Sequence, residues 1–230
     1  MLLLAAGLGR RFGSPTPKVY LECAGTTLVE RSLARLAAVT DDREIIVACP
    51  PEADWEGEGS PAAFTARLEA AGATRIVTGG ASRQESMQRC LDASDPEAGV
   101  VLVHDAARPF FPVEAVRKAI AHAEAGDSAL LAIPAPDTLK RVDPEGRVEA
   151  TVDRAGVWLA QTPQVMPRAS LLRALDEARR TGFDGTDDVS LLERLGETVH
   201  VVTGSPTNIK ITSPQDMGLA EQIAAAEKTT

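Results

Sequence analysis

The sequence predicts an α/β fold built on a mostly parallel, doubly wound sheet. Up to residue 134, short apolar runs alternate with segments of helical periodicity, which is typical of strands joined by crossover helices. Two runs, within 43–49 and 99–104, are almost continuously apolar, as expected of strands that helices cover on both faces. A length of 230 residues and a hydrophobic content of 44% suit a single domain over residues 1–230.

The expected elements follow this rhythm along the chain. Strands are expected at 1–6, 43–49, 74–78, 99–104 and 128–134, and later at 198–203 and 208–212. Helices are expected at 27–39, 82–94, 113–125, 167–181 and 187–195. Thr27 and Ser82 are the expected N-caps of two helices, and Ser213-Pro214 begins the last helix. Residues 50–63, rich in Pro, Gly and Glu, are expected to form a loop.

Residues 136–157 interrupt the alternation. Two extended runs flank a D-P-E-G turn at 143–146, a pattern typical of a β-hairpin. Their residues include too few apolar side chains for a position in the core. We therefore expect a projecting arm, and a projecting arm usually needs a partner.

Charge and cysteine content exclude several classes of protein. The net charge of -9 argues against a non-specific nucleic-acid binder, so any anionic substrate must meet a local cluster of Lys and Arg. The three cysteines, Cys23, Cys49 and Cys90, form no C-x-x-C pair, which fits a reducing cytoplasm better than a disulfide framework or a zinc site. The apolar start is too short for a signal peptide or a membrane span and is expected to be a buried strand.

The turn after the first strand concentrates glycine and positive charge. Gly7, Gly9 and Gly13 let the backbone curl so that successive N–H groups can face one anion. The basic residues of this turn are Arg10, Arg11 and Lys18. A dinucleotide-binding fingerprint would need glycine where Phe12 stands, and no G-K-S/T triplet forms a Walker loop. The pattern favours phosphate binding over an ordinary glycine turn with solvated arginines.

Two further segments have open roles at this stage. Asp105 follows the most apolar strand, at the end of the sheet where α/β folds bind ligands, so it can hold Mg²⁺ or cap a loop. The neighbouring Arg108 is expected to pair with a carboxylate inside the protein. Gly79-Gly80 could admit a flat base read by Ser82 or Ser86, although a capped turn with an exposed Arg83 is favoured.

The remaining polar candidates have ordinary explanations. Asn208, Lys210 and Thr212 share one face of an expected strand, which is typical of a solvated edge. His104 and His200 have no Ser or Cys partner in a recognisable motif, so neither is assigned a catalytic role.

Seven short strings occur in one order and together carry a resemblance. They are A-A-G-L-G-R-R-F-G…P-K, G-G…R-Q-E-S, V-H-D-A-A-R-P-F, D-T-L-K-R, T-V-D-R, T-P-Q and N-I-K-I-T. The sequence closely resembles the 2-C-methyl-D-erythritol 4-phosphate cytidylyltransferase family of the non-mevalonate isoprenoid pathway, over nearly the whole chain. The resemblance implies a Rossmann-like nucleotidyltransferase sheet, with an arm at 136–157 that embraces a second subunit to form a homodimer.

The resemblance also implies an activity and its residues. CMP would pass from CTP to 2-C-methyl-D-erythritol 4-phosphate, giving 4-diphosphocytidyl-2-C-methyl-D-erythritol and pyrophosphate, with Mg²⁺ as cofactor. The catalytic positions are Arg11, Lys18 and Lys210. The nucleotide-binding positions are Ala5, Ala6, Gly7, Gly9, Gly80, Ala81, Ser86, Asp105 and Ala106, with Asp105 also on the metal. Thr138 and Arg154, on the arm, match residues that hold the polyol phosphate in the other subunit's site.

Some positions depart from the family pattern, and two rival functions stay open. Leu4 replaces a proline found in many members, and Ala81 and Thr207 replace residues that are often acidic. Ribitol-5-phosphate cytidylyltransferase shares the first loop and the chemistry, but the D-A-A-R, D-T-L-K-R and T-V-D-R strings favour methylerythritol phosphate. A non-catalytic nucleotide-binding module would not need Arg11, Lys18 and Lys210 together.

Overall fold

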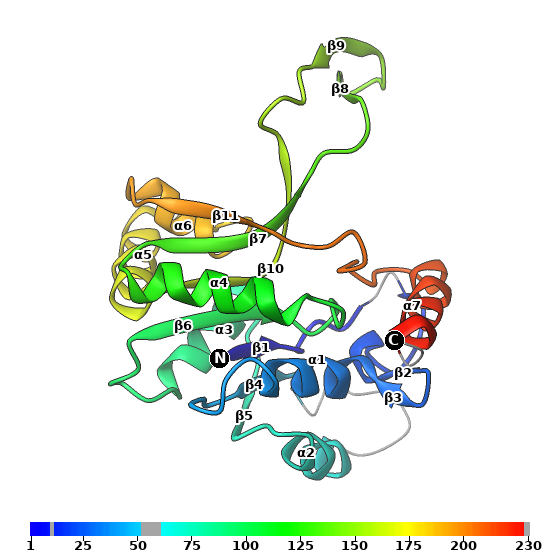
Figure 1. Ribbon diagram of the computed structural model, residues 1–230, viewed down its shortest axis with the longest axis vertical. Helices are drawn as coiled ribbons and strands as arrows, with labels where there is room; N and C mark the ends of the chain where they lie inside the picture. The colour runs from blue at the N-terminus through cyan, green and yellow to red at the C-terminus, as the bar shows by residue number, and fades with distance from the viewer. Residues whose placement is uncertain (10–11, 52–60, 228–230) are drawn as a thin grey trace.

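The computed structural model describes residues 1–9, 12–51 and 61–227, with no side-chain description for 61–63. A seven-stranded sheet, in the order β11-β7-β10-β6-β1-β4-β5, lies between two layers of helices (Figure 1). Its strands are β1 Leu2–Leu4, β4 Ile46–Cys49, β5 Arg75–Thr78, β6 Val100–Asp105, β7 Ser128–Pro134, β10 Trp158–Pro167 and β11 Val199–Thr203. Every pairing is parallel except those of β10, which runs antiparallel to both β6 and β7. The predicted mostly parallel, doubly wound sheet is confirmed.

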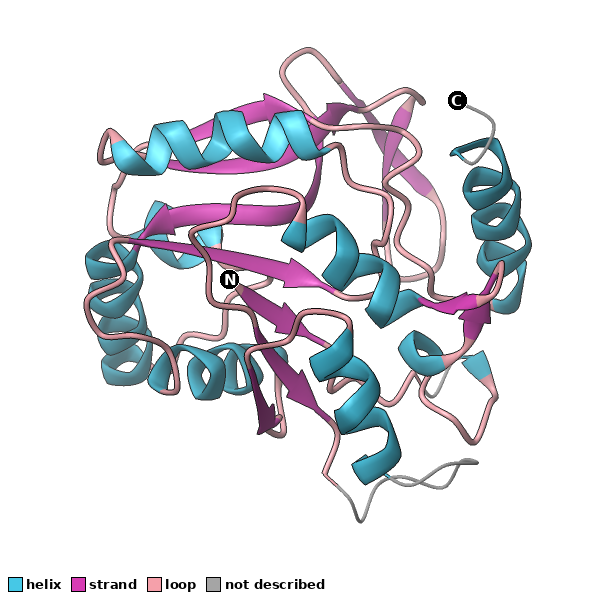
Figure 2. Ribbon diagram, turned by 60° about the horizontal axis from the view of Figure 1, so that its bottom comes forward, coloured by secondary structure: helices cyan, strands magenta, loops and turns pink. Residues whose placement is uncertain are grey.

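Alternate side chains of the strands supply two separate cores. Leu3, Val47 and Leu102 pack under α1 (Leu28–Ala37), α2 (Pro61–Ala70) and α4 (Val113–Glu124) on one face. Leu2, Ile46 and Val101 pack under α3 (Arg83–Asp92), α5 (Arg168–Thr181) and α6 (Val189–Arg194) on the other. Burial on both faces explains why these strands are apolar at successive positions. The last helix, α7 (Pro214–Glu227), packs beside a small hairpin of β2 (Glu22–Cys23) and β3 (Thr26–Thr27) (Figure 2).

The predicted N-caps are confirmed. The Thr27 hydroxyl accepts a hydrogen bond from the Glu30 N–H, and the Glu30 carboxylate accepts one from the Thr27 N–H, which completes a capping box. The Ser82 hydroxyl caps α3 by accepting a hydrogen bond from the Glu85 N–H. Ser213 precedes α7 and accepts a hydrogen bond from the Asp216 N–H at 3.4 Å.

The arm is also confirmed. Strands β8 (Leu139–Val142) and β9 (Val148–Val152) form a separate antiparallel hairpin that projects away from the sheet (Figure 1). Two apolar side chains of this hairpin, Val142 and Val148, are 52% and 62% exposed, so the described part of the chain leaves them uncovered.

Four expectations about secondary structure were wrong or incomplete. The sequence did not predict β10, because Pro163 within it argues against a central strand; the structure accommodates Pro163 in an irregular register between Ala160 and Gln164. Helix α2 begins at Pro61, inside the expected loop 50–63, of which 52–60 lie outside the described residues. The β2–β3 hairpin was not anticipated, and residues 208–212 form no strand.

Among the described residues, no helix combines the length and apolar character that a membrane span requires.

Candidate active site

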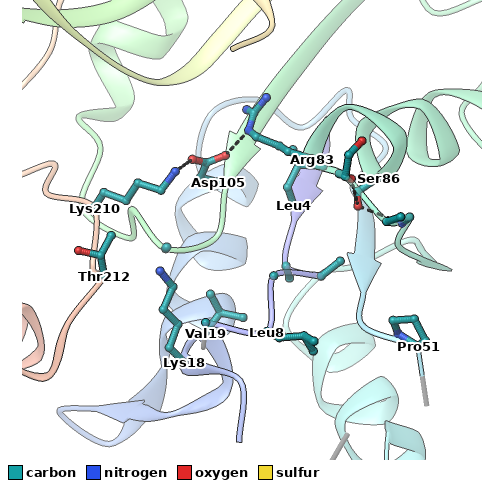
Figure 3. A pocket seen from close by; sticks show the side chains of 18 residues that line it. Leu4, Leu8, Lys18, Val19, Pro51, Arg83, Ser86, Asp105, Lys210 and Thr212 are labelled. Carbon is teal, nitrogen blue, oxygen red and sulfur yellow. Dashed lines mark hydrogen bonds and ion pairs between the residues drawn. The ribbon is translucent and has the colours of Figure 1, made fainter. Parts of the chain in front are cut away.

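A cavity of about 710 Å³ opens at the carboxyl ends of β1 and β6 (Figure 3). That edge of a parallel sheet is where α/β folds bind ligands. Its lining comes from the first loop at 4–9, from Lys18, from the turn at 80–86, and from single residues including Asp105 and Lys210. Residues separated widely in sequence therefore meet in one cavity.

The first loop and Lys18 form one wall of this cavity. Gly9 has a φ of +63°, and a Cβ placed there would lie 3.1 Å from the Lys18 Cγ, so glycine permits the loop to curl against the lysine. Lys18 begins a short 3-10 helix, and its ammonium points into the cavity (Figure 3). Ala5, Ala6 and Gly7, which the resemblance implies to be nucleotide-binding positions, line the same wall. Arg11, predicted to be catalytic, lies outside the described residues.

The turn at 79–86 closes against the first loop. A Cβ on Gly79 would lie 2.2 Å from the Ala6 Cβ, so this close approach requires glycine. Ser86 is 4% exposed, and its hydroxyl accepts a hydrogen bond from the Gly80 N–H and donates one to the Ser82 carbonyl. The Glu85 carboxylate accepts one from the Ala81 N–H at 2.8 Å. Gly80, Ala81 and Ser86 all line the cavity, and these bonds hold the turn in shape beside it.

Asp105 lies between two cations at the end of β6. Its Oδ1 accepts a hydrogen bond from the Arg83 Nε at 3.1 Å, and its Oδ2 accepts one from the Lys210 Nζ at 2.7 Å. Burial alone would raise the pKa of Asp105, but the charges of Arg83 and Lys210 outweigh it and hold that pKa far below its usual range. Asp105 is therefore ionised at neutral pH and faces the cavity.

Ala106, predicted to face the ribose, does not line the cavity. Its side chain is fully buried in the core, and its N–H donates to the Leu4 carbonyl at 3.0 Å. The next residue, Ala107, lines the cavity instead.

The segment that carries Lys210 is held by buried polar groups rather than by a sheet. The Asn208 side chain is fully buried and donates hydrogen bonds to the Gln161 Oε1 at 3.1 Å and the Thr162 carbonyl at 2.9 Å. The Ile211 N–H donates to the Ala107 carbonyl at 2.9 Å. The interpretation of 208–212 as a solvated edge strand is therefore wrong, because Asn208 is an internal anchor that brings Lys210 to Asp105.

The prediction that Arg108 pairs with a carboxylate is also wrong. Its guanidinium donates hydrogen bonds to two carbonyl oxygens, that of Asn208 at 3.0 Å and that of Ala160 at 3.4 Å. Arg108 thus adds to the anchoring of the segment that carries Lys210.

Arg83 was expected to be exposed, but it joins two carboxylates. Its Nη1 and Nη2 donate to the two oxygens of Asp188 at 2.7 Å each, while its Nε reaches Asp105. Burial opposes the charge of Arg83, yet the two carboxylates outweigh it and raise the pKa of Arg83 above its already high value. Sequence reasoning missed Asp188 because it lies 105 positions from Arg83.

His104, to which the sequence assigned no catalytic role, is not among the described residues that line the cavity. It is fully buried, and burial lowers its pKa to about 3, so it is neutral at physiological pH. Its Nδ1 lies 2.9 Å from the Thr162 hydroxyl oxygen, which also accepts a hydrogen bond from the Asp105 N–H. His104 therefore supports the backbone that carries Asp105.

The two predicted arm residues are remote from this cavity. Thr138 and Arg154 are exposed, and Arg154 donates a hydrogen bond to the Pro136 carbonyl within the arm. Among the described residues that line the cavity, neither appears.

Comparisons with known proteins identify the family of this chain. The family model for 2-C-methyl-D-erythritol 4-phosphate cytidylyltransferase matches residues 1–226. The proteins of that name from Geotalea uraniireducens and Chromobacterium violaceum are each 44% identical to this chain, over 96% and 98% of it and 94% and 97% of their own lengths. The crystal structure of that enzyme from Thermus thermophilus is 36% identical and superimposes with a TM-score of 0.78, covering 97% of this chain and 98% of that one. The chain therefore belongs to the 2-C-methyl-D-erythritol 4-phosphate cytidylyltransferase family.

Proposed function

We propose that the cavity binds CTP and 2-C-methyl-D-erythritol 4-phosphate, and that the enzyme transfers CMP to the polyol phosphate with release of pyrophosphate. The observation that carries this function is the meeting of Lys18, Asp105 and Lys210 at the carboxyl end of parallel strands. Two anionic substrates must be brought together in a protein of net charge -9, so local cations have to offset their repulsion. The names of the similar proteins support the same assignment.

The reaction is a single displacement at the α-phosphorus of CTP. A phosphate oxygen of the polyol phosphate forms the new bond, the bond to the bridging oxygen breaks, and pyrophosphate leaves. Because the second pKa of a phosphate is about 6, the nucleophile is already an anion near neutral pH and needs no general base. Lys18 and Lys210 therefore act by positioning and by offsetting the negative charge that develops at phosphorus. Arg11 is proposed to join them.

Mg²⁺ fits this site through Asp105. Mg²⁺ in nucleotide enzymes typically takes one or two carboxylates together with phosphate oxygens and water. Asp105 offers one ionised carboxylate at the cavity, and each of its oxygens accepts one hydrogen bond, which leaves a lone pair for a metal. In the described part of the chain, no group of three His, Cys, Asp or Glu could hold a metal, so the nucleotide would supply most ligands. When bound, the ion would neutralise charge on the phosphates.

The arm is proposed to complete the site of a second chain. Thr138 and Arg154 lie on a hairpin that extends away from its own sheet, and the hairpin exposes Val142 and Val148. Exposed apolar side chains on a projecting element fit contact with a partner. We infer a homodimer in which the arm of each chain brings Thr138 and Arg154 to the polyol phosphate bound by the other.

We also infer that the protein works in the cytoplasm. Its three cysteines, Cys23, Cys49 and Cys90, are free thiols, and Cys23 and Cys90 are buried. Free thiols fit a reducing compartment. Fractionation of the native cells with an antibody to the chain checks this location, and a signal confined to membranes or to the exterior would contradict it.

Pyrophosphate release measures the proposed reaction directly. The assay pairs each of the four NTPs with 2-C-methyl-D-erythritol 4-phosphate, with ribitol 5-phosphate, or with no acceptor. The cavity near Ala5, Ala6 and Gly80 is lined by small residues, so we expect CTP to be strongly preferred over ATP and GTP. Release should require methylerythritol phosphate. Preference for ribitol 5-phosphate, or comparable turnover of a purine nucleotide, would contradict the assignment.

A further inference from the structure

We propose that Arg83 and Asp188 form a positioning pair that aims the Asp105 carboxylate and thereby sets where Lys210 rests. This inference rests on the proposed function. In Figure 3 the Arg83 side chain reaches Asp105 at the cavity, whereas Asp188 is not among the described residues that line the cavity. Arg83 acts through Asp105, so its effect must pass through that carboxylate.

The first step is the fixed plane of the Arg83 guanidinium. Asp188 has a side chain only 1% exposed, so its charge needs a partner in the protein. Arg83 supplies two parallel hydrogen bonds of 2.7 Å to the two oxygens of that carboxylate. Such a two-point contact fixes orientation as well as distance, and a lysine could not reproduce it.

The second step is the anchoring of Asp188 itself. Gln164 on β10 accepts hydrogen bonds from the backbone N–H groups of Asp188 at 2.9 Å and of Val189 at 3.1 Å. Its amide donates to the neighbouring Asp187 carboxylate at 2.8 Å. The segment before α6 is thus tied to the central sheet, and Asp188 offers Arg83 a rigid support.

The third step is the transfer of this orientation to the cavity. With its plane fixed, Arg83 turns its Nε–H toward the Asp105 Oδ1 at 3.1 Å. The other oxygen, Oδ2, then faces the Lys210 ammonium at 2.7 Å. The carboxylates of Asp105 and Asp188 balance the charges of Arg83 and Lys210. The ion pair between Lys210 and Asp105 therefore belongs to a group with no net charge. Without Arg83, the Asp105 carboxylate could rotate and Lys210 would lose its position.

Kinetics of Arg83→Gln test the proposal against a matched control. The variant should lower kcat/KM by about 10- to 100-fold, the usual cost of removing a group that orients a functional ligand. Arg117→Gln is the control, because Arg117 also makes three contacts, to Glu114 and to the carbonyls of Ala38 and Val39, but lies on α4 away from the cavity. It should keep wild-type kcat/KM. Arg83→Lys keeps the positive charge beside Asp188, so it tests the proposal even if Arg83→Gln fails to fold. Its kcat/KM should fall almost as much as that of Arg83→Gln.

A double-mutant cycle separates positioning from mere support of the fold. If Arg83 acts through Asp105, adding Arg83→Gln to Asp105→Asn should reduce kcat/KM by less than about threefold further, because the group it orients is already gone. Full additivity of the two losses would overturn the proposal. So would wild-type kcat/KM in a folded Arg83→Lys protein.

Equilibrium binding of CTP gives a readout that needs no turnover. Calorimetry with CTP in Mg²⁺ and in EDTA should show that Arg83→Gln weakens the metal-dependent gain in affinity by about tenfold or more. The affinity in EDTA should fall less, because only the contact of the displaced Lys210 with the phosphates is then lost. An equal loss of CTP affinity in Mg²⁺ and in EDTA would indicate that the variant disturbs the whole nucleotide site, and it would reject the proposal. If the wild-type enzyme itself released no pyrophosphate, the proposed function would fail first; additive variants of an active enzyme would refute the positioning role alone.

Discussion

The two walls of the cavity are built in different ways. The first wall, residues 5–9 and Lys18, comes from one part of the sequence. The opposite wall, which we call the assembled wall, joins Arg83, Asp105 and Lys210 from three distant segments, with Asp188 behind them. Strand β10 ties these segments together, because Thr162 supports Asp105 and Gln164 supports Asp188.

This difference predicts how each wall responds to damage. The shape of the first wall depends on local backbone conformation, so single glycines control it. The assembled wall depends on charge balance among buried groups, so removal of one member leaves its partners uncompensated. Variants of the two walls should therefore fail in different ways, which the following experiments measure.

Loss of the Lys18 ammonium should give the largest effect. Lys18→Ala should lower kcat/KM by roughly 10²–10³, because a cation that offsets charge in the transition state is removed. Lys118→Ala, an exposed lysine on α4, is the control and should behave as wild type. The measurement is steady-state pyrophosphate release, with circular dichroism to confirm folding. Near-wild-type activity in a folded Lys18→Ala protein would remove Lys18 from the mechanism.

Mixed dimers test whether the arm of one chain completes the cavity of the other chain. Lys18→Ala and Arg154→Ala homodimers should each be nearly inactive. In a mixed dimer one site receives both changes and the other receives neither, so random exchange should restore about a quarter of all sites. If the arm served its own chain, every site would keep one change and mixing would restore nothing. The measurement is activity after confirmed subunit exchange.

Most of the fold could be predicted because its information is local. Apolar runs such as Ile45–Val47 and caps such as Thr27 are visible in a few adjacent residues, and each matched the structure. Strand β10 was missed because Pro163 argues against a central strand and only the tertiary register accommodates it. Helix α2 was missed because its first residues lie in a stretch rich in Pro and Gly.

The site residues also differ in whether their local sequence reveals their role. Phosphate binding by the first loop was predicted from its glycines and concentrated basic residues and stays a prediction, while the structure places Gly7, Gly9 and Lys18 in the cavity. Lys210 and Ser86 needed a family resemblance, because their own surroundings in sequence suggested an edge strand and a capped turn. Neither the local pattern nor the family resemblance predicted the pairing of Arg83 with Asp188, because neither local sequence indicates a salt bridge that spans 105 positions. Long-range charge pairing has no period or spacing that a single sequence reveals.

A smaller effect is expected where the turn at 79–86 meets the first wall. Gly79→Ala would place a Cβ 2.2 Å from the Ala6 Cβ and must push the two segments apart. Overpacking of this kind costs about 1–3 kcal/mol, so the affinity for CTP should fall by about 2- to 12-fold if half of that cost falls on binding. Gly99→Ala is the control, because its Cβ would meet nothing within 4 Å. Equal CTP affinities of the two variants, by calorimetry, would show that this close approach does not shape the nucleotide site.

The smallest effect should separate backbone strain from contact with Lys18. Gly9 and Gly13 have φ values of +63° and +73°, so alanine at either position should cost about 1–2 kcal/mol of stability. Only at Gly9 would the new Cβ meet Lys18, at 3.1 Å from its Cγ, while at Gly13 it would meet nothing within 4 Å. A 1 Å misplacement of a reacting group can cost about 10²-fold, so a shift of a few tenths of an ångström should cost roughly threefold to fivefold. We therefore expect Gly9→Ala and Gly13→Ala to lose similar stability in urea, while only Gly9→Ala loses kcat/KM. Equal losses of kcat/KM would mean that the first wall responds to strain as a whole, and that Gly9 does not set the position of Lys18.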